Sequence, residues 1–150
     1  MSPKTDELVV RKSLVVECTP ERAFSTFTER IGEWWPLATH SVFGEDAETA
    51  VLEGREGGRL YERSRGGEES VWGTVTAWEP PRRLVLTWHP GRGEETAQDL
   101  EVRFEPAGDA IRVELVHTGW ERLPGGGAEE AANYHPGWDV VLGRYVRAVG

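Results

Sequence analysis

Cysteine is almost absent from this chain of 150 residues, which contains only Cys18. A single cysteine excludes an intramolecular disulfide and a zinc site built from several cysteines. The start, MSPKTDELVV, has no basic end followed by an apolar run, and no apolar stretch approaches the roughly 18 residues of a membrane span. We therefore expect a cytoplasmic protein with no signal peptide and no membrane partner.

Positive charge is also scarce, since 17 basic residues stand against 26 acidic ones and give a net charge of −9. A chain of this sign repels the phosphates of nucleic acid and of anionic lipid surfaces. The basic residues are dispersed along the chain as well. We expect no nucleic-acid partner.

The sequence has no spacing typical of a metal or cofactor site. Its histidines are far apart in the chain and form no i, i+4 pair, so we expect no bound metal. The paired glycines lack a P-loop lysine or a strand-to-helix dinucleotide pattern, and hairpin turns explain them. No serine lies in a G-x-S-x-G elbow. We expect no cofactor and no catalysis by a nucleophilic side chain. The histidines are His40, His89, His117 and His135.

The first third of the chain predicts a strand followed by two short helices. The β-branched run 8–17 is typical of a half-exposed strand. Thr19 and Pro20 form a helix start, and Gly32 and Pro36 interrupt and end the helical pattern. We expect two helices that meet near 30–32 and bury one apolar stripe. That stripe consists of Phe24, Phe27, Ile31, Trp34 and Trp35.

Six further strands follow, separated by glycine or proline turns that are short enough to make neighbouring strands antiparallel. We place them near 49–53, 59–65, 70–78, 83–89, 97–105 and 110–118. The segment VWGTVTAW does not show which face is buried, and a β-bulge could mix its two sets of side chains. Alternation in the last strand points His117 toward the apolar side.

The chain ends with a helix whose apolar stripe has helical spacing. Pro136 either kinks this helix or marks where its stable part begins. A curled antiparallel sheet with a long C-terminal helix across its concave face makes an α+β fold, in one domain over 1–150. A cavity between sheet and helix is the expected ligand site. The stripe consists of Tyr134, Trp138, Val141, Tyr145 and Ala148.

Candidate residues for the wall of that cavity are aromatic or lie on the inward stripe, although the same side chains would also fill a core that is short of aliphatic residues. His117 is either a core histidine bonded to a backbone carbonyl or a general base. The GGRLYE strand directs either Tyr61 or Glu62 inward. The candidate ligand-binding residues are Trp35, Phe43, Tyr61, Trp72, Trp88, His117, Tyr134, Trp138 and Leu142, with His40 and Phe43 in a loop at the mouth.

Several segments in order resemble the START-like superfamily (SRPBCC, helix-grip, birch-pollen-allergen type), and within it the branch of activators of the 90-kDa heat-shock-protein ATPase. The resemblance implies a β-α-α-β6-α helix-grip fold, with a curved antiparallel sheet wrapped around a long C-terminal helix. Members bind lipids, sterols or polyketides, act as cyclases or aromatases, or serve as co-chaperones, so the fold leaves the activity open. The segments are TPERAFSTFTERIGEWWPLATHSVFG, GGRLYE, WGTVTAWEPPRRLVLTW, HTGWERL and a late PGW.

Three functions remain open at this point. The first is a non-enzymatic protein that binds a small hydrophobic or aromatic molecule in the cavity. The second is an enzyme of cyclase, dehydratase or hydrolase type with His117 as general base, assisted by Glu62 or Tyr61. The third is an interaction module of the co-chaperone kind. A homodimer and a chaperone partner are left open by the sequence.

Overall fold

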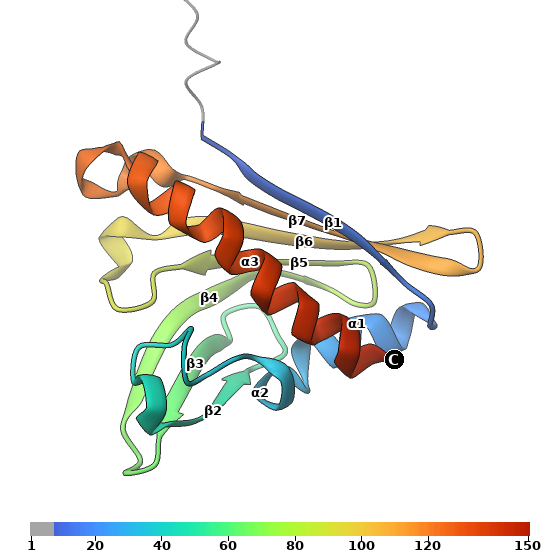
Figure 1. The fold of residues 1–150 in the computed structure, drawn as a ribbon, viewed down its shortest axis with the longest axis horizontal. Helices are drawn as coiled ribbons and strands as arrows, with labels where there is room; N and C mark the ends of the chain where they lie inside the picture. Colours follow the sequence, from blue (N-terminus) through green and yellow to red (C-terminus); the bar gives the residue numbers. More distant parts are fainter. Residues whose placement is uncertain (1–7) are drawn as a thin grey trace, which may run out of the picture.

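The computed structural model describes residues 8–150 as a seven-stranded antiparallel sheet that curls around a C-terminal helix (Figure 1). The segment MSPKTDELVV, in which the sequence shows no signal-peptide pattern, lies mostly outside the described residues. The order of elements, one strand, two helices, six strands and a helix, is that of the expected α+β helix-grip fold. The strands are β1 (Val10–Val16), β2 (Ala47–Leu52), β3 (Arg59–Ser64), β4 (Glu69–Glu79), β5 (Arg83–Trp88), β6 (Gln98–Ala107) and β7 (Ala110–Thr118).

The sheet has the order β1-β7-β6-β5-β4-β3-β2. Strands β2 to β7 form the expected meander, and β1 joins it antiparallel to β7, so the two edges are β1 and β2. Residues of β5, of β7 and of β6 as far as Glu105 alternate between buried and more exposed positions, which places one face on the core and the other in solvent. Short 3-10 turns cover Gly44–Asp46, Glu94–Thr96, Trp120–Arg122 and Pro124–Gly126.

Helix α1 (Pro20–Thr28) begins as its capping residues predict, and α2 (Ile31–Trp34) follows it without a side-chain cap. The Thr19 hydroxyl accepts a hydrogen bond from the Arg22 backbone N–H (3.1 Å), and Pro20 takes the first helical position. Trp35 leaves the helix in an extended conformation ahead of Pro36. The predicted stripe from Phe24 to Trp35 is buried throughout.

Strand β4 contains the bulges that its sequence left open. The pairing register shifts between Leu60 and Tyr61 of β3 and again between Val75 and Ala77 of β4. Each shift adds one residue to β4, so the side chains that reach the core lie three residues apart instead of two. These inward side chains are Trp72, Val75 and Trp78.

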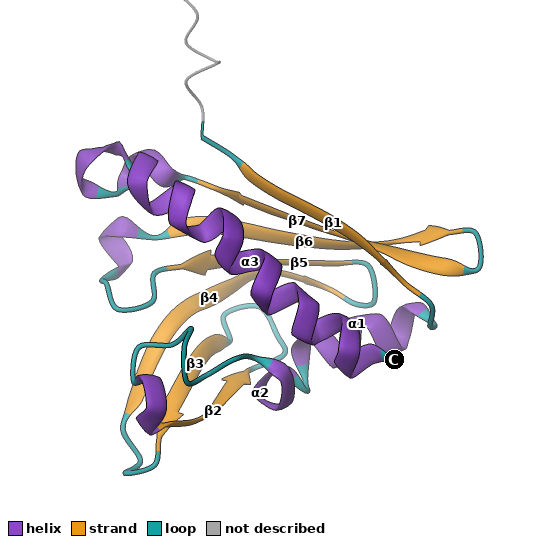
Figure 2. Ribbon diagram, viewed as in Figure 1, coloured by secondary structure: helices purple, strands orange, loops and turns teal. Residues whose placement is uncertain are grey.

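Helix α3 (Ala128–Val149) runs across the concave face of the sheet (Figures 1 and 2). It is continuous through Pro136, so the alternative that the helix begins near Pro136 is wrong. Pro136 and Ala132 are both exposed, and water can therefore reach the carbonyl that has lost its partner N–H. The Tyr145 hydroxyl donates to the Ala23 carbonyl (2.7 Å) and ties α3 to α1. No helix within 8–150 is long and apolar enough to cross a membrane.

Candidate functional site

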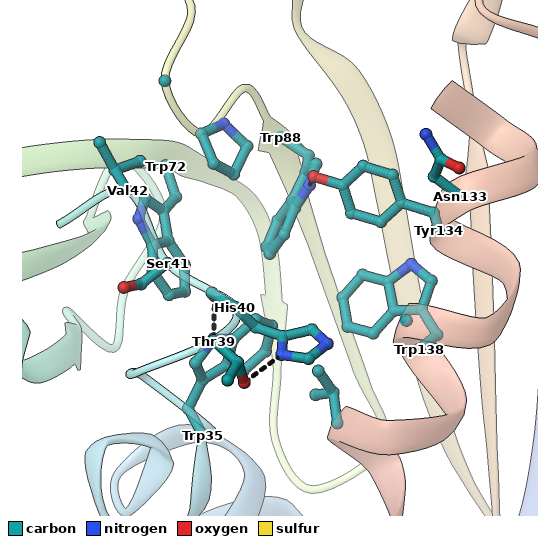
Figure 3. A pocket seen from close by; sticks show the side chains of 14 residues that line it. Trp35, Thr39, His40, Ser41, Val42, Trp72, Trp88, Asn133, Tyr134 and Trp138 are labelled. Atoms are coloured by element: carbon teal, nitrogen blue, oxygen red, sulfur yellow. Dashed lines mark hydrogen bonds between the residues drawn. The ribbon is translucent and has the colours of Figure 1, made fainter. Parts of the chain in front are cut away.

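A cavity of about 480 Å³ lies between α3, the loop that follows α2, and strands β4 and β5 (Figure 3). Its volume is within the range of about 300–1,000 Å³ that is typical of small-molecule sites. The lining is mainly apolar, with polar side chains from the loop and from α3. The residues around it are Trp35, Thr39, His40, Ser41, Val42, Trp72, Trp88, Pro90, Gly91, Asn133, Tyr134, Gly137, Trp138 and Val141.

Four tryptophans from four different segments form the inner wall of this cavity. Trp35 packs against Trp72 with ring centroids 5.0 Å apart, and Trp88 packs against Trp138 at 5.3 Å. Trp35 also contacts Trp88 at 6.0 Å and Trp138 at 5.8 Å, so the rings make one continuous surface. Behind them the core leaves a void of about 10 Å³, no larger than one water. The open space therefore lies on the solvent side of the indoles.

Each of these four indole N–H groups is already bonded to an acceptor of the protein. A ligand in the cavity therefore meets ring faces and edges, because no indole donor is free to orient it. The acceptors also hold each ring in one orientation. The bonds run from Trp35 to the His40 carbonyl (2.7 Å), from Trp72 to Glu62 Oε1 (2.6 Å), from Trp88 to the Tyr134 hydroxyl (3.0 Å) and from Trp138 to His117 Nδ1 (3.1 Å).

His117 is fully buried behind Trp138 and does not line the cavity. Its Nδ1 accepts the Trp138 indole proton, so Nε2 carries the ring proton and donates to Gln98 Oε1 (3.2 Å). Burial lowers the pKa of His117 to about 3, which keeps the ring neutral at physiological pH. With both nitrogens engaged, His117 orients Trp138 and has no free position for a ligand proton. Its partners are two side chains, where the sequence favoured a backbone carbonyl.

Glu62 is the residue of the Tyr61-Glu62 pair that faces inward. Tyr61 lies on the outer face of the sheet, where the Arg59 guanidinium covers its ring at 4.3 Å. The buried Glu62 carboxylate accepts the backbone N–H groups of Val42 (2.7 Å) and Phe43 (2.9 Å) as well as the Trp72 indole. It therefore joins the loop at the mouth of the cavity to the wall of the cavity.

The polar side of the cavity was only partly visible in the sequence. His40 lines it, as its place in the loop suggested, and its Nδ1 lies 2.7 Å from Thr39 Oγ1 (Figure 3). The Tyr134 hydroxyl faces Trp88, and burial raises the pKa of Tyr134, so it stays protonated at neutral pH. Thr39, Ser41 and Asn133 were not predicted, because residues of loops and helix edges carry no periodic signal.

The structure gathers Trp35, Trp72, Trp88, Tyr134 and Trp138 around the cavity, and leaves the other sequence candidates outside its lining. Phe43 is half-buried where its backbone N–H binds Glu62, and Leu142 is buried in the core. Tyr61 is on the opposite face of the sheet, and His117 is one layer deeper. Within residues 8–150 no group of three or more histidine, cysteine or acidic side chains could hold a metal ion.

Similar structures share this fold. An anthrahydroquino-γ-pyrone synthase, Txn09, solved in a complex, is 35% identical, with a TM-score of 0.64 over 93% of this chain and 96% of that one. The Aha1 dimer from Colwellia psychrerythraea is 17% identical, with a TM-score of 0.69 over 94% of this chain and 95% of that one. Protein MLL2253 from Mesorhizobium loti is 13% identical, with a TM-score of 0.67 over 94% and 96%. The last two show the fold alone.

No curated protein sequence matches this chain. The family model for "Activator of Hsp90 ATPase homolog 1-like protein" matches residues 17–149, which include both short helices, strands β2 to β7 and α3. The chain therefore belongs to the family of activator of Hsp90 ATPase homolog 1-like proteins.

Proposed function

We propose that the cavity binds a flat, polycyclic aromatic molecule of the polyketide type. The observation that carries this proposal is the wall of four tryptophans whose indole N–H groups are all bonded within the protein. Such a wall offers wide ring surfaces and few polar demands, which favours a planar aromatic ligand over a polar one. Polar side chains at the mouth would fix the orientation of the ligand.

The size of the cavity supports a ligand of about three fused rings. Burial of roughly 200 Å² of apolar ligand surface is worth about 5 kcal/mol before the costs of association. Stacking on the indoles adds about 0.5–1.5 kcal/mol for each well-placed ring pair. With four indoles these gains total about 7–11 kcal/mol, and association costs of about 4 kcal/mol or more leave at most about 7 kcal/mol. We therefore expect a dissociation constant of about 10 μM or weaker.

A second candidate function is ring closure on such a molecule. It is favoured by the 35% identity to Txn09, an anthrahydroquino-γ-pyrone synthase. The cavity also has what the pure binding function does not require, namely a histidine and a phenol in its lining. The hypothesis that His117 is the base has no support in this geometry, because that ring is sealed behind Trp138.

An interaction module of the co-chaperone kind has less support. It would need a contiguous apolar patch on the surface. The large apolar side chains that are exposed within the described residues are four separate valines on β1, on the loop at the mouth and on α3. The homodimer stays a prediction, with the Aha1 dimer among the similar structures as its support, and light scattering would test it.

Titration with anthraquinone tests the proposed binding. Anthraquinone should quench the tryptophan fluorescence of the protein with saturation, because four of the seven tryptophans lie at the cavity. Dodecanoate, a flexible lipid of similar apolar surface, should displace it poorly. The proposal fails if anthraquinone does not saturate, or if dodecanoate binds as tightly as anthraquinone.

A further inference from the structure

Two titratable side chains in the cavity lining have positions from which they can exchange protons with a ligand. Within the described residues, His40 and Tyr134 are the titratable members of the lining. His40 belongs to the loop after α2, and Tyr134 belongs to the first half of α3, so they come from different walls (Figure 3). A base and an acid on separate walls of an apolar cavity are the arrangement that general acid–base catalysis requires.

The neighbours of His40 determine which of its nitrogens faces the cavity as a base. The Thr39 hydroxyl can donate to the Pro36 carbonyl (3.5 Å), and its oxygen then accepts from His40 Nδ1 (2.7 Å). With the proton on Nδ1, the lone pair is on Nε2. Nε2 makes no hydrogen bond to any residue within 8–150, and Figure 3 shows the ring extending from the loop toward Trp138.

The environment of Tyr134 makes it a proton donor. Its oxygen accepts the Trp88 indole proton (3.0 Å), and its own hydroxyl proton has no acceptor among the described residues. The neighbouring Trp138 and Trp88 rings keep this side of the cavity apolar, so a donor here acts at low dielectric. The Tyr134 hydroxyl can therefore donate its proton to an oxygen atom of a ligand.

We propose that His40 and Tyr134 form an acid–base pair for a ligand that carries a phenolic hydroxyl and a conjugated carbonyl group. His40 Nε2 accepts the hydroxyl proton, and the Tyr134 hydroxyl donates its proton to the carbonyl oxygen. This inference rests on the proposed binding of a polycyclic aromatic ligand and adds the chemical class of the substrate and the roles of two residues.

The same pair can close an oxygen-containing ring on a hydroxyaryl enone. The phenolic oxygen, once it has lost its proton to His40, forms a C–O bond with the β-carbon of the enone. The electron pair of the C=C bond moves toward the carbonyl oxygen, which takes the Tyr134 proton and becomes an enol. The proton on His40 then returns to the Tyr134 oxygen through solvent, and the enol becomes a ketone. The product is an isomer of the substrate, so no oxidant or reductant is needed.

The charged groups around the pair do not neutralise it. No carboxylate is in the cavity lining that the structure describes, so His40 has no acidic partner there. At the mouth, the Arg92 guanidinium is near Tyr134 and is 3.6 Å from the Glu130 carboxylate. A phenolate held in the cavity is therefore paired with the imidazolium of His40.

The dye 2-hydroxyanthraquinone reports this proton transfer, because its visible absorption changes when its phenol ionises. We expect the phenol of the bound dye to titrate about 1–3 pH units lower in the wild-type protein than in buffer, as a group beside a cation does. His40→Gln should abolish this difference, and Tyr134→Phe should reduce it. His135→Gln, on the exposed side of α3, is the matched control and should behave as wild type.

Plain anthraquinone has no hydroxyl group to ionise, so it tests ligand binding separately from proton transfer. If it fails to bind the wild-type protein, the proposed function fails. If it binds wild type and His40→Gln equally while the dye titrates as in buffer, only the acid–base pair is refuted. If the phenol of the bound dye titrates as low in His40→Gln as in wild type, the acid–base pair is refuted as well.

Ring closure is followed with 2′-hydroxychalcone, which loses absorbance as it isomerises to a flavanone. Wild type should accelerate this reaction over buffer, and His40→Gln or Tyr134→Phe should each remove about 10²-fold or more of the acceleration. A wild-type rate equal to that in buffer overturns the ring-closing step.

Discussion

Removal of the Glu62 carboxylate should both destabilise the protein and loosen the mouth of the cavity. Glu62 is fully buried and accepts hydrogen bonds from Val42 N (2.7 Å), Phe43 N (2.9 Å) and Trp72 Nε1 (2.6 Å). Glu62→Ala leaves these three donors without their acceptor. A buried donor without a partner costs about 1–3 kcal/mol. The two backbone donors belong to half-exposed residues that water can reach, so we expect a total loss of about 3–5 kcal/mol.

Glu62→Gln refines this prediction. The amide keeps the shape of the side chain and one acceptor oxygen, but its NH2 group turns a donor toward another donor. We expect a loss of about 1–3 kcal/mol, together with weaker binding of anthraquinone, because the 41–43 segment loses part of its anchor.

Urea unfolding followed by tryptophan fluorescence measures the free energy of unfolding of both variants. Glu105→Ala, which removes an exposed carboxylate of β6, is the control and should stay within about 0.5 kcal/mol of wild type. A loss below about 1 kcal/mol for Glu62→Ala would refute the role of the carboxylate as the anchor of the loop.

Two further predictions concern His117 and Gly73. Because the pKa of His117 falls from 6.5 to about 3 on folding, the unfolded chain takes up a proton below pH 6.5 that the folded protein refuses, so stability decreases as pH falls. Between pH 6.5 and 5 this costs about 1.5–2 kcal/mol, and urea unfolding of His117→Gln should lack that part of the slope; equal slopes would contradict a buried neutral ring. Gly73→Ala should cost about 2–3 kcal/mol in the same assay, since its methyl group would collide with the Thr87 carbonyl oxygen, and a neutral effect would contradict this packing.

The elements of the fold were predictable because each follows from a local pattern. Thr19 and Pro20 predicted the start of the first helix, glycine and proline turns separated the strands, and the apolar stripe from Tyr134 to Ala148 predicted α3. The register of β4 was not predictable, because the two bulges depend on how β3 and β5 pair with it. The inward side of Trp72 therefore became visible only in three dimensions.

The candidate site shows the same division between local and distant information. Alternation correctly turned His117 inward, but it could not show that Trp138, 21 residues later, would come between His117 and the cavity. The choice between Tyr61 and Glu62 depended on a bulge and on a loop that Glu62 binds about 20 residues away in sequence. Aromatic side chains identified the wall, whereas the polar mouth depends on contacts between distant segments.

Two glycines of α3 offer the most direct test of whether the cavity is the ligand site. Gly137 lines the cavity and Gly143 does not, and a Cβ at either position meets no atom within 4 Å. Leucine should stabilise the helix at both positions by about 0.5–1 kcal/mol, because it is a better helix former than glycine. In Gly137→Leu, however, the new side chain would occupy the cavity.

The decisive measurement is the affinity for anthraquinone in Gly137→Leu and Gly143→Leu, by quenching of tryptophan fluorescence. The cavity site predicts a loss of at least about tenfold in Gly137→Leu, equal to about 1.4 kcal/mol, with wild-type affinity in Gly143→Leu and undiminished stability in both. Equal affinities in the two variants would contradict the central claim that the ligand binds between α3 and the tryptophan wall.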